Sequence, residues 1–178
     1  LNSEISTKTY YFWRGTQQFG TNEIDKGDAI VTDNNDEIYI AGASYGVFPS
    51  NNNGSERSGF VARFDKTGLK KWIIQFEDKY VNYIADIKLD SKKNILVLYR
   101  KTMLNNNFFI AKISTDGIFL SKKEYGTTEL DRVNKLFIDT NDDIYLCGDT
   151  YGQFPSNNKN GDRDAFVMKL DTNGTIIW

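Results

Sequence analysis

The chain repeats itself, and this repeat limits its possible folds more than any other feature. When the sequence is shifted by 106 residues, residues 19–72 align with residues 125–178 without a gap, and 23 of the 54 positions are identical. Chance similarity does not produce such a match. The chain is therefore built from copies of one structural unit, and the length of that unit should indicate the fold.

A third, more divergent copy lies between the two strong ones. Its marker positions are Asp33, Ile38, Phe60 and Gly68 in the first copy, Asp90, Ile95, Phe109 and Gly117 in the second, and Asp139, Ile144, Phe166 and Gly174 in the third. The two steps are 57 and 49 residues long, and the difference falls between residues 42 and 60 of the first copy. A segment whose length varies by eight residues between copies is an exposed loop.

Each copy is expected to form short β-strands separated by polar turns. The expected strands are residues 28–32, 37–42, 60–64 and 69–76 in the first copy, 85–89, 95–99, 109–113 and 118–125 in the second, and 134–138, 143–148 and 166–170 in the third. The turns between them are rich in Asn, Asp and Gly. No long stretch has apolar residues at helical spacing. The sequence therefore predicts an all-β fold.

Four strands every 49 to 57 residues is the spacing of β-propeller blades. Each blade has two apolar faces, which explains why the second and third strands of each copy are hydrophobic on both sides. We expect residues 20–76, 77–125 and 126–178 to form three blades, residues 9–19 to be the outer strand of a preceding blade, and residues 1–8 to be a lead-in. A β-sandwich is the alternative, but it does not predict so regular a repeat.

Three blades are fewer than the four at which known propellers usually close. The outer strand of the last copy also only begins before Trp178. We therefore expect the chain to belong to a larger propeller of six to eight blades. The alternative is that several copies self-assemble into a ring, with residues 9–19 pairing onto an open blade.

Composition excludes several classes of function. The net charge is −2, with 22 Lys and Arg against 24 Asp and Glu, so a surface for nucleic acid is not expected. No apolar run approaches the ~20 residues that span a bilayer, so no direct membrane insertion is expected. The chain has no histidine, which removes Ser-His-Asp and Cys-His catalysis within it. The single cysteine, Cys147, aligns with Ala41 and Leu98, and we expect it to be a buried core residue.

The motifs of the outer copies resemble the SBBP repeat, a β-propeller repeat of secreted and cell-surface bacterial proteins. The resemblance lies in Asp-x-x-x-Asp/Glu-Ile-Tyr-Ile/Leu-x-Gly, which starts at Asp33 and Asp139, and in the Gly-x-Phe-Pro-Ser that follows. The middle copy departs from this pattern, since Tyr99 replaces the glycine and Ser121 stands where the outer copies have Trp. The resemblance implies an extracellular or cell-surface propeller, with no activity shared across the family.

Two further segments are similar to the tryptophan-docking motif of quinoprotein propellers. They run from Phe64 to Trp72 and from Leu170 to Trp178, each with Asp-x-x-Gly-x-x-x-Trp at its end. The similarity implies that Trp72 and Trp178 pack between adjacent blades. A quinone cofactor would need a polar and metal-ligating set around the propeller axis, which the sequence does not contain, and we expect no cofactor.

The long loops of the outer copies are the candidate ligand-binding segments. Each combines aromatic rings, a Phe-Pro turn and a run of amides, which suits stacking on and hydrogen bonding to a protein or glycan ligand. The candidate residues are Tyr45, Phe48, Asn51, Asn52, Tyr151, Phe154, Asn157 and Asn158. The alternative is that Phe-Pro plugs the loop against the edge of the blade.

A cation site is a further candidate, and a weaker one. Asp139, Asn141 and Asp143 imitate the first ligands of a calcium loop, but the glycine at its sixth position and the glutamate at its twelfth are missing. A hairpin turn is the simpler interpretation, and we expect no metal.

These features favour a non-enzymatic propeller module of an exported bacterial protein, acting in adhesion, binding or assembly. Its rigid blades would present variable loops to a protein or glycan. The alternative is a fragment of a propeller enzyme, such as a glycosidase, lyase or quinoprotein, whose active site lies partly outside this piece. No residue of this chain is assigned a catalytic role.

Overall fold

The fold consists entirely of strands and their connections. A computed structural model describes residues 15–49, 57–77, 79–101 and 107–178, and within these ranges it contains eleven β-strands and no helix. The part of the chain so described therefore has no helix long and apolar enough to cross a membrane. The predicted all-β class is confirmed.

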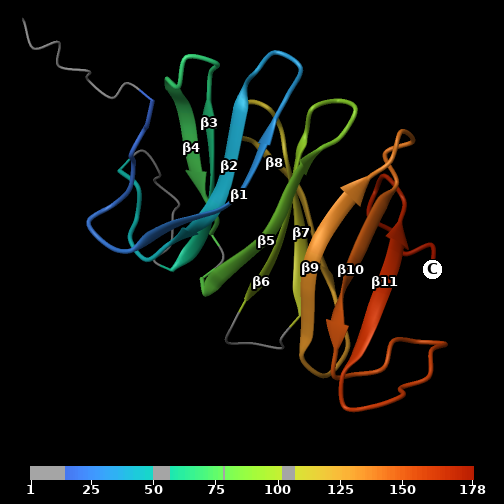
Figure 1. Cartoon of the computed structure of the whole chain (residues 1–178). Helices are drawn as coiled ribbons and strands as arrows, with labels where there is room; N and C mark the ends of the chain where they lie inside the picture. The colour runs from blue at the N-terminus through green and yellow to red at the C-terminus, as the bar shows by residue number, and fades with distance from the viewer. Residues whose placement is uncertain (1–14, 50–56, 78, 102–106) are drawn as a thin grey trace, which may run out of the picture.

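The strands form three antiparallel sheets that follow one another along the chain and stand side by side (Figure 1). The first contains β1 (Asp25–Thr32), β2 (Ile38–Ser44), β3 (Ser58–Phe64) and β4 (Lys70–Gln75) in that order. The second contains β5 (Val81–Leu89), β6 (Ile95–Lys101), β7 (Phe108–Ile113) and β8 (Phe119–Tyr125). The third has only three strands, β9 (Asp131–Ile138), β10 (Ile144–Thr150) and β11 (Asp164–Leu170). The row of sheets is not closed into a ring.

The expected outer strand at residues 9–19 falls partly outside the described residues. Residues 9–14 are not described, and residues 15–19 form no strand within the described chain, so the outer strand of a preceding blade stays a prediction. The physical reason is that a strand needs a partner, and no sheet in the described part of the chain precedes the first one. The side chain of Phe19 nevertheless packs on the first sheet.

Side-chain hydrogen bonds of the polar turns hold the hairpins in register. Between β1 and β2, the Asp33 carboxylate accepts hydrogen bonds from the main-chain N–H groups of Asn35 at 2.8 Å and Glu37 at 3.1 Å. The turns between the third and fourth strands need a glycine at a positive φ, and Gly68 and Gly117 both have φ of 82°. The turn chemistry of the sequence therefore determines where each hairpin folds back.

The hydrophobic core lies between the sheets. One cluster joins the first two sheets through Tyr39, Ala41 and Val61 on one side and residues such as Val97 on the other. A second cluster joins the second and third sheets, with Leu96, Leu98, Ile110, Leu146 and Met168 among its members. Consecutive residues of β6 and β7 in the middle sheet alternate between the two clusters, so both faces of these two strands are buried.

Polar contacts connect each sheet to the next at the turns. The Trp72 indole N–H donates to the Thr115 carbonyl at 3.0 Å, and an Nη1 N–H of Arg63 donates to the same oxygen at 2.9 Å. Trp72 therefore lies between the first and second sheets. From the second sheet to the third, the Tyr125 hydroxyl donates to the Gly174 carbonyl at 2.7 Å.

The Asp90 carboxylate generates a first testable prediction. Its side chain is 4% exposed and accepts hydrogen bonds from the Lys112 ammonium at 2.8 Å and from the Asn94 main-chain N–H at 2.7 Å. Burial raises the pKa of Asp90, but the hydrogen bonds from Lys112 and Asn94 outweigh it and hold the pKa below its usual value. We expect Asp90→Ala to lower the free energy of unfolding in urea by about 2 to 3 kcal/mol at pH 7.

The pH dependence gives the control. A lowered pKa in the folded state means that the stabilisation is present above the unfolded-state pKa and is lost as the pH falls through the folded-state value. The difference in free energy of unfolding between wild type and Asp90→Ala should therefore become smaller below about pH 4. Asp162→Ala, which removes an exposed loop carboxylate, should change stability by less than about 0.5 kcal/mol. A difference in free energy of unfolding that stays the same at all pH values would contradict stabilisation by the ionised Asp90 carboxylate.

Candidate functional site

The loop of the first sheet folds inward at its aromatic ring. Phe48 is 3% exposed, and its ring centroid lies 5.3 Å from that of Phe60. The Phe48 main-chain N–H donates to the Gln75 side-chain oxygen at 3.1 Å, while the Gln75 amide donates to the Gly46 carbonyl at 2.7 Å. Phe48 thus plugs the loop against the sheet, and its burial corrects the expectation that this ring faces a ligand.

The loop of the third sheet is more open. Phe154 is half-buried against Phe166, with ring centroids 5.0 Å apart. Asn157 and Asn158 are exposed, and the Asn157 side-chain amide donates to the Pro155 carbonyl at 3.0 Å. The predicted loop residues of this copy therefore come together on one loop. Their counterparts Asn51 and Asn52 lie outside the described residues.

The two candidate tyrosines occupy equivalent and similar environments. Tyr45 and Tyr151 are both half-buried. The guanidinium of Arg57 lies 5.6 Å from the ring centroid of Tyr45, and that of Arg132 lies 5.6 Å from the ring centroid of Tyr151. Each ring is thus engaged on one face by a cation from its own copy.

The candidate cation ligands are used by the hairpin itself. The Asp139 carboxylate accepts hydrogen bonds from the N–H groups of Asn141 at 2.8 Å and Asp143 at 3.0 Å, and Asp143 pairs with the Lys169 ammonium at 2.7 Å. Desolvation raises the pKa of Asp139, but the main-chain hydrogen bonds from Asn141 and Asp143 outweigh it and hold the pKa below its usual value. The carboxylate is therefore ionised within the turn. Nowhere in the described ranges do three or more possible ligands form a metal-binding group.

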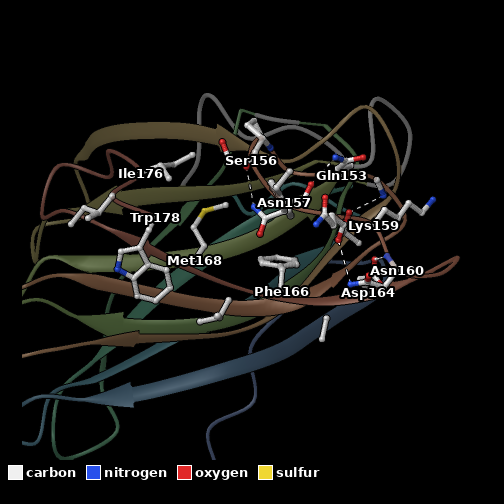
Figure 2. Close-up of a pocket in the computed structure, with 18 residues that line it drawn as sticks. Gln153, Ser156, Asn157, Lys159, Asn160, Asp164, Phe166, Met168, Ile176 and Trp178 are labelled. Carbon is white, nitrogen blue, oxygen red and sulfur yellow. Dashed lines mark hydrogen bonds between the residues drawn. The ribbon is translucent and has the colours of Figure 1, made fainter.

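A cavity of about 750 Å³ lies beside β11, between that strand, the long loop and the C-terminal segment (Figure 2). Phe166, Met168 and Trp178 line it with apolar surface, and the loop contributes side chains such as Gln153 and Asn157. Phe154 and Asn158 also line it. The cavity therefore gathers three of the predicted loop residues of the third sheet, Phe154, Asn157 and Asn158, around an unpaired strand edge.

The cavity occupies the position that a fourth strand fills in the other two sheets. The C-terminal segment begins such a strand, since Ile177 donates its main-chain N–H to the Lys169 carbonyl at 2.8 Å and Lys169 donates to the Trp178 carbonyl at 2.9 Å. In the first sheet the register continues with Ile73, Ile74 and Gln75 opposite Ala62, Val61 and Phe60. The corresponding residues of β11, which are Met168, Val167 and Phe166, have no such partner strand among the described residues.

The outer face of the third sheet is also open. Tyr39, Ala41 and Val61 are each 0% exposed in the first sheet, where the second sheet covers them. At the equivalent positions of the third sheet, Tyr145 is half-buried, Cys147 is exposed, and Val167 is 62% exposed. Trp178, equivalent to Trp72, is 58% exposed and contacts Tyr145 with ring centroids 6.4 Å apart. Within the described chain it packs on its own sheet only.

The exposure of Cys147 corrects the expectation that it is a buried core residue. Its position is that of a core residue, because the equivalent Ala41 is fully buried. What differs is the neighbour: no further sheet in the described part of the chain covers this face. Residues of the strand edge and of this face, such as Val167, were not among the predicted site residues. The sequence signal that places Val167 on this face is its alignment with Val61 in the repeat.

Comparisons with known proteins add little to this geometry. No protein-family model matches the chain, and no curated protein matches it significantly. Among solved structures, the chain is similar to a protein of unknown function from Bacteroides caccae, known from a crystal structure at 1.35 Å resolution. The two share 11% sequence identity with a TM-score of 0.38, over 86% of this chain and 66% of the other.

The two loop phenylalanines give a second testable prediction. Phe48→Ala should lower the free energy of unfolding by about 3 to 5 kcal/mol, because it empties a buried site. Phe154→Ala should lower the free energy of unfolding by about 1 to 2 kcal/mol, because that ring is only half-buried. Urea denaturation of the two variants against wild type measures both. Equal losses would contradict the different burial of the two loops.

Proposed function

We propose that the three sheets are consecutive blades of a β-propeller and that the module is a non-enzymatic scaffold for binding and assembly. Support comes from the antiparallel order of four strands in the first two sheets, from their face-to-face packing, and from the tryptophan that joins one sheet to the turn of the next. The proposed setting, outside the cell or on the surface of a bacterium, rests on the resemblance to the SBBP repeat.

The start of a fourth strand beside β11, in the register that β4 has beside β3, is the observation that carries this proposal. An edge strand presents unpaired N–H and C=O groups, and an extended polypeptide can bind there by adding a strand to the sheet. The main-chain N–H and C=O groups of Ala165 and Val167 point towards the cavity. Successive residues of β11 direct these groups to opposite sides of the strand, and Lys169, two residues after Val167, bonds to the C-terminal segment on the cavity side. The element that fits there is therefore an outer strand in the register of β4.

The side chains around the cavity support binding rather than chemistry. The Asp164 carboxylate accepts the Asn160 main-chain N–H at 2.8 Å, and the Lys159 ammonium donates to the Tyr151 carbonyl at 2.7 Å. These charged groups shape the loop that walls the cavity (Figure 2). Phe166, Met168 and Trp178 remain as apolar surface for alternate side chains of an added strand.

A peptide copied from the chain's own outer strand provides the test. The peptide Ile-Ile-Gln-Phe-Glu-Asp-Lys reproduces residues 73–79, which follow Trp72 as an added strand would follow Trp178. We expect the fluorescently labelled peptide to bind the chain saturably in fluorescence anisotropy. A scrambled peptide of the same composition is the control.

The strand edge itself is tested by Val167→Pro. Proline removes the N–H that faces the cavity but leaves the hydrogen bonds to β10 in place, and proline is tolerated on edge strands. Affinity for the peptide should fall by about tenfold or more, as expected for a lost main-chain hydrogen bond and a disturbed edge. Equal binding of the scrambled peptide, or no effect of Val167→Pro, would refute strand addition at β11.

A further inference from the structure

A second cavity, of about 170 Å³, lies between the second and third sheets. The buried side chains of Leu96, Ile110 and Ile144 give it an apolar lining. The rest of the lining comes mainly from β8 and from the turn after β11. We call it the interface cavity. Its walls are strands and turns of two neighbouring sheets, so it does not lie at an end of the row.

The equivalent place between the first and second sheets is filled by an indole ring. A Cβ atom built on Gly117 would lie 3.3 Å from the Trp72 ring, so this ring covers the turn. The ring centroids of Tyr39 and Trp72 lie 6.5 Å apart. In the repeat, Trp72 aligns with Ser121 and Tyr39 aligns with Leu96. Two smaller side chains thus replace two aromatic ones, and the interface cavity is the space that this change leaves.

The acceptor that the Trp72 indole uses has a counterpart at the interface cavity. The Thr115 carbonyl accepts hydrogen bonds from the Trp72 indole N–H at 3.0 Å and from Arg63 at 2.9 Å. The equivalent carbonyl belongs to Thr172, which lines the cavity. No donor to the Thr172 carbonyl is found in the described part of the chain. A bound N–H group would therefore meet an acceptor there.

The charges around the interface cavity favour an anion. Lys112 and Lys123 line it, and no acidic residue of the described chain does so. Lys112 is already paired with the Asp90 carboxylate at 2.8 Å. The stem of Lys123 crosses Gly174, because a Cβ atom built on that glycine would lie 3.1 Å from Lys123 Cδ. Asp171 interacts electrostatically with Lys123 but does not line the cavity. Lys123 is therefore the cation placed to bind a carboxylate at this site.

We propose that the interface cavity binds a small planar aromatic acid that carries an N–H donor. The ring takes the place that the Trp72 indole has in the first interface, the N–H donates to the Thr172 carbonyl, and the carboxylate pairs with Lys123. The volume fits such a ring, since a cavity of ~150 Å³ with aliphatic and aromatic walls binds benzene. The interface cavity is separate from the cavity beside β11, so this proposal does not depend on strand addition there.

Indole-3-acetate is the probe, and isothermal titration calorimetry on the 178-residue chain measures its binding. It should bind saturably. Naphthalene-1-acetate, which has no N–H group, should bind about three- to tenfold more weakly. Lys123→Ala should weaken binding of indole-3-acetate by about threefold, as expected for an exposed ion pair. The matched control is Lys66→Ala, which removes an exposed lysine from a turn of the first sheet and should leave binding unchanged.

Ser121→Trp copies the first interface into the second. The new indole should fill the interface cavity itself and weaken binding of indole-3-acetate by about tenfold or more. A cooperative unfolding transition in urea checks that this variant is folded.

Amide resonances of the isotope-labelled wild-type chain locate the site without any variant. Indole-3-acetate should shift the resonance of Gly174, which lines the interface cavity. Gly117 is the internal control, because Trp72 covers its equivalent turn, and its resonance should stay in place.

The proposal is overturned if wild type shows no saturable binding, or if the resonances of Gly117 and Gly174 respond equally. Unchanged binding by Lys123→Ala or by folded Ser121→Trp would also overturn it. If Ser121→Trp does not fold, the comparison of Gly117 with Gly174 and the effect of Lys123→Ala decide the outcome.

Discussion

The need to cover both faces of each sheet is the constraint on which the rest of this structure depends. The inner strands of the middle sheet satisfy this constraint, because consecutive residues of β6 point alternately into the two clusters and Ile95, Val97 and Leu98 are each 0% exposed. Its outer strand, β8, is largely exposed. The first sheet satisfies it in part, by packing Phe19 on its outer face, while Ile30 of β1 stays 63% exposed. The third sheet leaves its outer face open. A stack of identical units always has this asymmetry, because each interior face is shared while each terminal face needs a separate cover.

The contacts between sheets show how the stack keeps its geometry while the sequence varies. The first sheet reaches the next through Trp72, whose indole bonds to a turn carbonyl. The second sheet has Ser121 at that position and uses the Tyr125 hydroxyl instead, bonding to the Gly174 carbonyl of the equivalent turn. Both solutions satisfy a main-chain carbonyl at the same hairpin with a side-chain donor. The hairpin turn, rather than any single residue, is thus the fixed point of the interface.

The presence of an outer strand beside the loop decides whether the loop is closed or borders a cavity. In the first sheet, Gln75 on β4 bonds to the loop on both sides of Phe48, and the aromatic ring is buried. In the third sheet no residue in the described chain takes the place of Gln75, and Phe154 remains half-buried beside a cavity. The same loop motif is therefore a sealed plug in one copy and the wall of an open site in the other. An added strand would convert the second state into the first.

The sequence by itself determined the repeat unit, the all-β class and the strand order within a unit. These properties are local: alternating apolar residues make strands, and Asp, Asn and Gly at set positions make turns such as those at Asp33 and Gly68. Only the tertiary structure decided which of these residues are covered. Val61 and Val167 occupy the same position in the repeat, yet one is 0% and the other 62% exposed. Phe48 was a ligand candidate by its motif and is buried by its neighbours, while Cys147 was a core candidate and is exposed. Burial depends on which sheet or strand lies alongside in space, and a repeated sequence specifies the unit without specifying what stands at its two ends.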